Sequence, residues 1–317
     1  MTQPLLRLLT QQGHTLTLLA PPWVAPIYRL MPEVNRVLEA PLAHGTLQLA
    51  ARWQLAQQLR GQFDSAYVLP NSLKSALIPW LARISQRVGY LGEHRSLLLT
   101  QTLPNPSKNQ RPSMLQHYAA LALPQNPEPL ADPALTVSTE QIAQARQALQ
   151  LGKDVCLIGF CPGAEYGPAK RWPAAHFAQL AALIAAHDPT LQIILLGSPK
   201  DKIIADEICA ISHAPMHNLC GTTTLEQACA LLAGCTAVVS NDSGLMHVTA
   251  ALRRPQVAVF GSSDPRHTPP HSPYAKVEWL ALECSPCFKR ECPLGHLHCL
   301  NQLTPERVWH TLSGLID

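Results

Sequence analysis

The sequence contains no apolar run of the roughly 18 residues that a membrane-spanning helix needs, so we expect no transmembrane segment. Residues 1–13 lack the basic start and the cleavage site of a secretory signal peptide. No cysteine occurs before Cys156, although the chain has ten. The cysteines from there to Cys235 lie in apolar segments, a pattern typical of reduced thiols and not of a disulfide framework. We therefore expect a cytoplasmic protein.

Charged residues are also scarce, at 14% against 47% hydrophobic residues, so a sizeable buried core is available. A length of 317 residues suits two domains, which we place at 1–152 and 153–317. The first contains 12 Lys+Arg and 7 Asp+Glu, and the second contains 12 and 14. A basic first domain favours an anionic substrate or surface, and we expect no nucleic-acid partner.

Short apolar runs alternate with amphipathic stretches, which predicts an α/β protein with parallel sheets. In the first half we expect strands at 15–20, 66–69 and 87–90 and helices at 73–85, 113–122 and 138–150. In the second half we expect a sheet of about five strands, at 155–160, 193–196, 237–240, 257–260 and 277–282. The helices expected there are 173–187, 200–211, 224–233, 245–252 and 304–315.

The start of the chain departs from this alternation. A doubly wound domain usually opens with a strand and a glycine-bearing turn into its first helix. Here residues 2–9 already predict that helix, and Gly13 would end it. We expect the missing strand in an in-frame extension of roughly 15–20 residues before Met1.

Residues 238–247, VVSNDSGLMH, join the end of a predicted buried strand to the start of a helix. The amides of that helix could hold an anion or a sugar hydroxyl, because the first amides of a helix have no partner within it. His247 would face the same point from one turn further on. Alternatively, Asp242 and Ser243 simply cap the helix and His247 packs under the sheet.

Residues 160–173, FCPGAEYGPAKRWP, also follow a predicted strand and precede a helix. Lys170 and Arg171 stand just before the helix, and cations beside exposed amides favour a diphosphate. The alternative is an ordinary basic loop. The segment is neither a Walker A loop nor a dinucleotide fingerprint.

These segments together resemble the ADP-heptose–lipopolysaccharide heptosyltransferases, glycosyltransferase family 9. The resemblance rests on PGA at 162–164, KRWP at 170–173, SNDSGLMH at 240–247, TAAL at 249–252 and GSSDP at 261–265. Three stretches resemble the heptosyltransferase II branch: MPEV at 31–34, PNSLKSAL at 70–77 and CSPCFKRECPLG at 284–295. The resemblance implies a GT-B fold of two facing Rossmann-like, doubly wound domains. The first domain would bind the acceptor and the second the nucleotide sugar.

The family's donor-site residues correspond to positions in this sequence. Lys170 matches the lysine at the donor phosphates, and Asp242 the acidic residue at the heptose; both are candidate catalytic residues. The remaining candidates for ADP-heptose binding are Ser243, Gly244, His247, Glu165, Tyr166 and Thr223. Arg171 is a candidate by position alone.

The resemblance implies transfer of heptose from ADP-heptose to the first heptose of the lipopolysaccharide inner core, with inversion and without a metal or other cofactor. The acceptor, of the heptosyl-Kdo2-lipid A type, is anionic and lies at the inner membrane. We therefore expect peripheral membrane contact by a monomer. Candidate acceptor contacts are the basic residues Lys74, Arg87, Arg95, Lys108 and Arg111, any of which could instead be plain surface charge.

In this family the first strand ends in a Gly-Asp turn whose aspartate is the proposed general base, and we expect that turn directly before Met1. Its absence from the sequence motivates one alternative, an inactive sugar-nucleotide-binding protein. A second alternative is a GT-B nucleotide-sugar 2-epimerase, which would need a UDP site and catalytic carboxylates.

Four late cysteines have the spacing C-x2-C-x4-C-x6-C and comprise Cys284, Cys287, Cys292 and Cys299. Such a spacing could surround a tetrahedral zinc ion. The family resemblance implies no structural metal, so we assign none, and the alternative is a loop of reduced thiols that serve packing.

Overall fold

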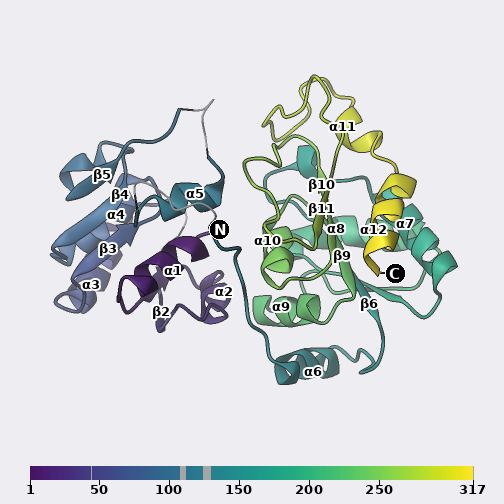
Figure 1. Ribbon diagram of the computed structural model, residues 1–317, viewed down its shortest axis with the longest axis horizontal. Coiled ribbons are helices and arrows are strands. Elements are labelled where there is room, and N and C mark those ends of the chain that lie inside the picture. Colours follow the sequence, from purple (N-terminus) through teal and green to yellow (C-terminus); the bar gives the residue numbers. More distant parts are fainter. Residues whose placement is uncertain (44, 108–111, 124–129, 317) are drawn as a thin grey trace. The chain divides into compact units, whose positions relative to one another are not determined.

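The computed structural model describes residues 1–43, 45–107, 112–123 and 130–316. The chain divides into two compact units, Met1–Ala131 and Asp132–Asp317, and both combine helices with parallel strands (Figure 1). The α/β class expected from the sequence is confirmed. None of the helices in the described part of the chain is long and apolar enough to cross a membrane.

The division falls earlier than the boundary expected at residue 152. Helix α6 (Thr139–Ala148) belongs to the second unit, where it packs against α9 (Leu225–Ala233). Arg146 of α6 donates hydrogen bonds to the carbonyl oxygens of Val155 and Gly234, at 2.9 and 3.0 Å. The amphipathic pattern of α6 predicted a helix correctly but held no information about which sheet it covers.

The first unit has short elements. Its helices are α1 (Gln3–Gln11), α2 (Ala25–Arg29), α3 (Leu49–Leu59), α4 (Leu73–Leu81), the short 3-10 helix η1 (Arg95–Leu97) and α5 (Met114–Ala119). Its strands are β1 (Thr17–Ala20), β2 (Arg36–Glu39), β3 (Ser65–Val68), β4 (Gln86–Tyr90) and β5 (Gln101–Leu103). Helices α3 and α4 pack together around Ala56, Leu59 and Ile78.

The strands of the first unit form two sheets, β1–β2 and β3–β4–β5, where we expected one doubly wound sheet. Helix α1 is where the sequence predicts the first helix, and its leucines at 5, 6 and 9 are buried. Because α1 begins at residue 3, the strand expected before Met1 stays a prediction. Among the described residues, no other strand bridges β1 and β3.

The second unit is built around a six-stranded parallel sheet with the order β11-β10-β9-β6-β7-β8. Its strands are β6 (Leu157–Cys161), β7 (Gln192–Leu195), β8 (Met216–Asn218), β9 (Ala237–Asn241), β10 (Gln256–Phe260) and β11 (Ala275–Trp279). Its further helices are η3 (Pro168–Lys170), α7 (Ala174–His187), η4 (Pro199–Asp201), α8 (Lys202–Ile211), α10 (Gly244–Ala251), α11 (His298–Asn301) and α12 (Pro305–Ile316). One strand more than expected is present.

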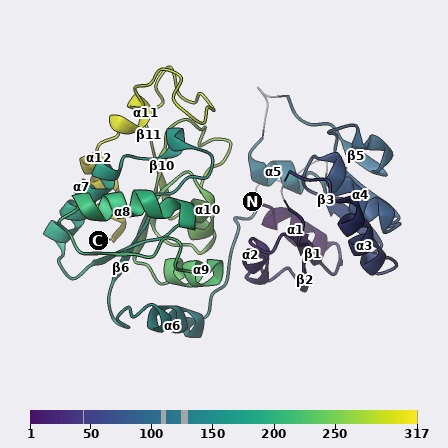
Figure 2. The same ribbon diagram turned by 180° about the vertical axis from the view of Figure 1, so that it is seen from behind.

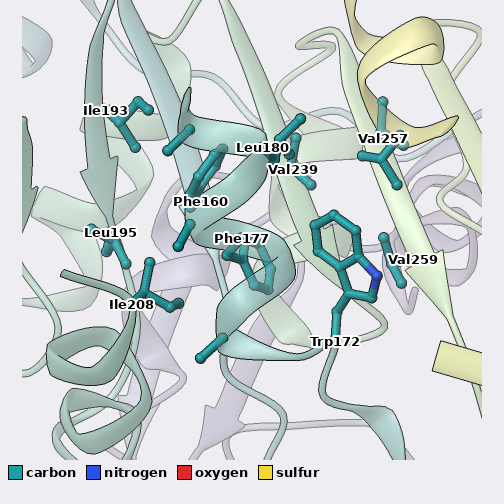
Figure 3. Close-up of a cluster of buried hydrophobic side chains, with 14 of the residues drawn as sticks. Phe160, Trp172, Phe177, Leu180, Ile193, Leu195, Ile208, Val239, Val257 and Val259 are labelled. Atoms are coloured by element: carbon teal, nitrogen blue, oxygen red, sulfur yellow. The ribbon is translucent and has the colours of Figure 1, made fainter. Parts of the chain in front are cut away.

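Layers of helices cover both faces of this sheet. Helices α7 and α8 lie on one face (Figure 2), where Phe160, Trp172 and Phe177 form part of an extensive apolar cluster (Figure 3). On the other face α10 packs against β9 and β10, with Met246 against Phe260 in a second cluster. Residues of β6, β9 and β10 are buried at every position, as expected of parallel strands covered on both sides.

Candidate functional site

The strand order of the second unit reverses between β6 and β9, which are neighbours in the sheet. In open α/β sheets, ligands bind at the carboxyl ends of the strands beside such a reversal, because the two following loops diverge there. The loop after β6 contains Lys170, and the turn after β9 contains Asp242. The topology therefore brings together the two segments that the sequence singled out.

Lys170 and Asp242 are in direct contact at this position. The Nζ atom of Lys170 lies 2.5 Å from Oδ2 of Asp242, whose side chain is only 5% exposed. The hydroxyl of Ser263 donates to the same carboxylate oxygen, also at 2.5 Å. Ser263 follows β10, so three loops meet at one carboxylate. The sequence suggested two of these residues, whereas Ser263 was only part of a motif without a role.

Asn241 fixes the two loops to one another. Its side-chain amide donates to the carbonyl oxygen of Pro162 at 2.6 Å, and its Oδ1 accepts from the backbone amide of Trp172 at 3.1 Å. Asn241 and Trp172 are fully buried. A buried amide with both ends bonded holds the loop after β6 in one position. We did not predict this role, although an asparagine at the end of a buried strand is the available signal.

Helix α10 presents its first amides without a side-chain cap. Ser243 occupies the N-cap position but makes no capping hydrogen bond, and the carboxylate of Asp242 is engaged by Lys170 and Ser263. The alternative that these two residues only cap the helix is therefore wrong. Gly244 is exposed, and a Cβ added there would have no atom within 4 Å. The backbone at the N-terminus of α10 is therefore accessible at Gly244, and helix N-terminal amides favour anions.

His247 is partly buried one turn into α10. Burial lowers the pKa of His247 to about 4, and the neighbouring Asp242 opposes this change. The imidazole is therefore neutral at physiological pH, and it can donate one hydrogen bond and accept another.

The other donor-site candidates occupy more exposed positions. Tyr166 lies near Lys170, whose Nζ is 5.2 Å from the centre of the tyrosine ring. Glu165 forms an exposed ion pair with Lys200, and Lys200 holds the pKa of Glu165 below its usual value. Thr223 is partly exposed just before α9. Arg171 folds back onto its own loop, where it donates to the carbonyl oxygen of Ala164 at 3.3 Å.

The candidate acceptor contacts do not lie together as the candidate donor residues do. Arg95 is fully buried, and its guanidinium donates to the carbonyl oxygens of Tyr90 and Pro70, so its prediction as an acceptor contact is wrong. Arg87 lies at the amino end of β4 and donates to the carbonyl oxygen of Leu98, away from the carboxyl edge of its sheet. Lys74 is partly buried in the first turn of α4, at the carboxyl end of β3. Lys108 and Arg111 lie outside the described residues.

The late cysteines were considered as possible zinc ligands. No group of three or more His, Cys, Asp or Glu side chains in the described part of the chain is arranged to hold an ion. Cys284 is exposed, whereas Cys299 is buried, and that burial raises the pKa of the Cys299 thiol to about 11. The thiols of Cys284, Cys287 and Cys292 add to that rise, and the absence of a structural metal stays a prediction.

Comparison with known proteins shows which family pattern, relatives and solved structures the chain resembles. The pattern of glycosyltransferase family 9 (heptosyltransferase) matches residues 52–298. Lipooligosaccharide heptosyltransferase 2 of Haemophilus ducreyi is 42% identical over 315 residues, which cover 94% of this chain and 89% of that protein. Lipopolysaccharide heptosyltransferase 2 of Escherichia coli is 42% identical over 311 residues, covering 94% and 88%. The solved structure of E. coli ADP-heptose lps heptosyltransferase II matches with a TM-score of 0.88 and 39% identity, covering 99% of this chain and 94% of that one.

Proposed function

Because the chain belongs to glycosyltransferase family 9, we propose that it transfers heptose from ADP-heptose to the first heptose of a lipopolysaccharide inner core. It is a glycosyltransferase of the GT-B fold, as the resemblance implied. The two alternatives, an inactive sugar-nucleotide-binding protein and a nucleotide-sugar 2-epimerase, receive no support, because the matched relatives are named as heptosyltransferases.

The contact between Lys170 and Asp242 carries this proposal. It places one cation and one carboxylate beside the uncapped amides of α10, at the reversal of strand order. A cation with helix amides suits the diphosphate of a sugar nucleotide, and a buried carboxylate suits the hydroxyl groups of its sugar. This combination supports ADP-heptose as the donor.

In the proposed reaction, an acceptor hydroxyl oxygen attacks the anomeric carbon of the heptose. The new carbon–oxygen bond forms as the bond to the diphosphate breaks, so the configuration inverts and ADP leaves. The hydroxyl proton passes to a base. Negative charge grows on the departing phosphate, where Lys170 and the amides of α10 would stabilise it. These groups would supply the stabilisation without a metal or other cofactor.

The lipopolysaccharide acceptor is attached to a lipid, so we propose that the protein acts as a monomer in peripheral contact with the inner face of the inner membrane. Residues 1–131 contain 11 Lys+Arg and 5 Asp+Glu, which favours an anionic surface. We define an apolar rim by five of the exposed apolar side chains of this unit, Leu47, Leu49, Trp53, Leu73 and Leu97.

The backbone around the apolar rim is tied together. Arg52 donates to the carbonyl oxygens of Leu47 and Lys74, at 2.6 and 3.0 Å, which joins the starts of α3 and α4. The backbone amide of Leu73 donates to the carboxylate of Glu93 at 2.9 Å. Exposed leucine and tryptophan side chains next to basic residues are typical of surfaces that lie at a membrane interface.

Substitution of Lys170 by alanine tests the donor site. We expect the rate of heptose transfer to fall about 100-fold or more, because one preorganised cation is lost from the leaving group. Titration calorimetry should show weaker binding of ADP. The matched control is Lys202→Ala, because Lys202 forms an exposed ion pair with Asp206 on α8. Full activity of a folded Lys170→Ala variant would exclude Lys170 from the reaction.

A further inference from the structure

The cysteine-rich segment 284–299 is hydrogen-bonded to the loop after β6, which contains Lys170, and to the loop after β10. The hydroxyl of Tyr166 donates to the carbonyl oxygen of Phe288 at 2.7 Å. The amide of Ala169 donates to the carbonyl oxygen of Arg290 at 3.0 Å, and the amide of Phe288 donates to that of Ser262 at 2.8 Å. The segment therefore borders the donor site, although the sequence motif gave it no role there.

Two cations lie against one aromatic ring at this border. The Nζ atom of Lys170 is 5.2 Å from the centre of the Tyr166 ring, and the guanidinium carbon of Arg290 is 5.4 Å from the same point. Both distances are within the range of cation–π attraction. Arg290 is thus held beside the lysine that the proposed function assigns to the donor phosphates.

The charges of these two cations differ in how far they are already neutralised. Lys170 forms a close ion pair with the buried carboxylate of Asp242. Arg290 is exposed, and among the described residues its side chain forms no ion pair within 4 Å. Its charge contributes only a minor part of the lowered pKa of Glu165, whose ion-pair partner is Lys200. A diphosphate brings more than one negative charge, which a single, already paired lysine would leave incompletely balanced. A guanidinium fits phosphate oxygens through two parallel hydrogen bonds.

We propose that Arg290 binds the diphosphate of the sugar-nucleotide donor, with the Tyr166 ring as the platform that orients its guanidinium. This inference rests on the proposed function. Gly167 keeps the two segments close, because a Cβ at this position would lie 2.5 Å from the carbonyl oxygen of Arg290. The φ angle of Gly167 is +150°, which also favours glycine.

The test measures the Kd for ADP by titration calorimetry in the full chain. We expect Arg290→Ala to raise this Kd about tenfold, the usual loss for one hydrogen bond to a charged group. Arg290→Lys should recover part of the affinity, because an ammonium keeps the charge but lacks the planar fork. The contact from Ala169 to Arg290 involves the main chain, so both variants keep it. Melting temperatures should therefore stay near that of the wild type.

Lys289 offers a matched control, because it is exposed, cationic and adjacent in the same segment. Lys289→Ala should leave the Kd unchanged. Tyr166→Leu should weaken ADP binding as Arg290→Ala does, whereas Tyr166→Phe, which keeps the ring, should weaken it less. The combined Tyr166→Leu and Arg290→Ala variant should lose less than the product of the two effects, because the pair acts as a unit.

The outcomes separate this inference from the proposed function. If Arg290→Ala binds ADP like the wild type while Lys170→Ala does not, the role of Arg290 is wrong and the donor site stands. An equal loss in Lys289→Ala would also overturn the inference, because it would indicate an effect of general charge. Wild-type protein that binds no ADP would overturn both.

Discussion

The two units differ in how their strands are stabilised. In the second unit, β6, β9 and β10 are buried along their whole length between two layers of helices. In the first unit, β1 and β3 contain one buried residue each, and the sheet is divided in two. Both units contain buried arginines that bond to main-chain carbonyls, Arg52 and Arg95 in the first and Arg146 in the second. The units therefore differ in apolar burial of their strands, and the first unit has less of it beside its arginines.

Among the substitutions considered, replacing Arg95 should lower the free energy of unfolding of the first unit the most. Arg95→Ala would leave the carbonyl oxygen of Tyr90 without two donors. The carbonyl oxygen of Pro70 and the side-chain Oδ1 of Asn71 would each lose one donor. Hydrogen bonds to charged groups contribute roughly 1.5–3 kcal/mol each and are not additive, so we expect a loss of about 3–5 kcal/mol. Urea denaturation with tryptophan fluorescence measures it.

The second unit provides the comparison for this variant. Arg146 also donates to several carbonyl oxygens, including those of Gly152 and Gly234, but it lies beside the larger core. Arg146→Ala should lower the free energy of unfolding without unfolding the second unit. ADP binding should survive in Arg95→Ala. Loss of ADP binding together with stability would show that the two units unfold cooperatively, against this comparison.

The same difference explains what the sequence could predict. The buried strands of the second unit appear as short apolar runs, so their positions were predicted to within about two residues. Strand β2 and helix α3 were not predicted. The buried face of α3 includes Arg52, which interrupts the apolar periodicity that identifies a helix. Where a polar side chain occupies a buried position of a helix, the periodic spacing of apolar residues is interrupted in the sequence.

The candidate site was predictable in part. Lys170 and Asp242 stand at strand ends that a parallel sheet brings together, and the family motifs contain both. Their direct contact and the participation of Ser263 depend on the strand order, which the sequence does not state. Arg95 was misplaced because an arginine that bonds to main-chain carbonyls looks in sequence like any surface arginine.

The pH dependence of stability tests the second unit through His247, with a moderate expected effect on the free energy of unfolding. Burial lowers the pKa of His247 to about 4 in the folded protein, against an unfolded value near 6.5. The unfolded state therefore binds the proton first as pH falls, so the contribution of His247 to stability is complete above pH ~6.5 and decreases toward pH ~4. The slope for one proton is at most about 1.4 kcal/mol per pH unit.

The measurement is urea unfolding at several pH values in the wild type and in His247→Asn. Carboxylates titrate in the same range, so the difference between the two proteins isolates the histidine. We expect that difference to change between pH 4 and 6.5 and to be constant above. A constant difference throughout would show that His247 is not held neutral by the fold.

Substitutions in the apolar rim should have the smallest effect on stability. They test whether the first unit, and not the second, contacts the membrane. Trp53→Ser combined with Leu49→Ser removes two exposed apolar side chains on α3. We expect binding to phosphatidylglycerol vesicles, measured by sedimentation, to weaken about tenfold or more, because each side chain loses apolar burial in the membrane interface. Stability and the Kd for ADP should not change.

The matched control is Ile203→Ser on α8 of the second unit, because Ile203 is 80% exposed and equally apolar. If membrane contact is confined to the first unit, Ile203→Ser should bind vesicles like the wild type. Transfer to a deacylated, soluble acceptor should be equal in all three proteins, because that acceptor needs no membrane. Equal vesicle binding by the rim variant would refute this docking surface, whereas equal loss in both variants would mean that the second unit contacts the membrane as well. The excess of basic residues in the first unit predicts in addition that added salt weakens vesicle binding of the wild type. Salt screens exposed charges over about 8–10 Å at 0.1–0.15 M.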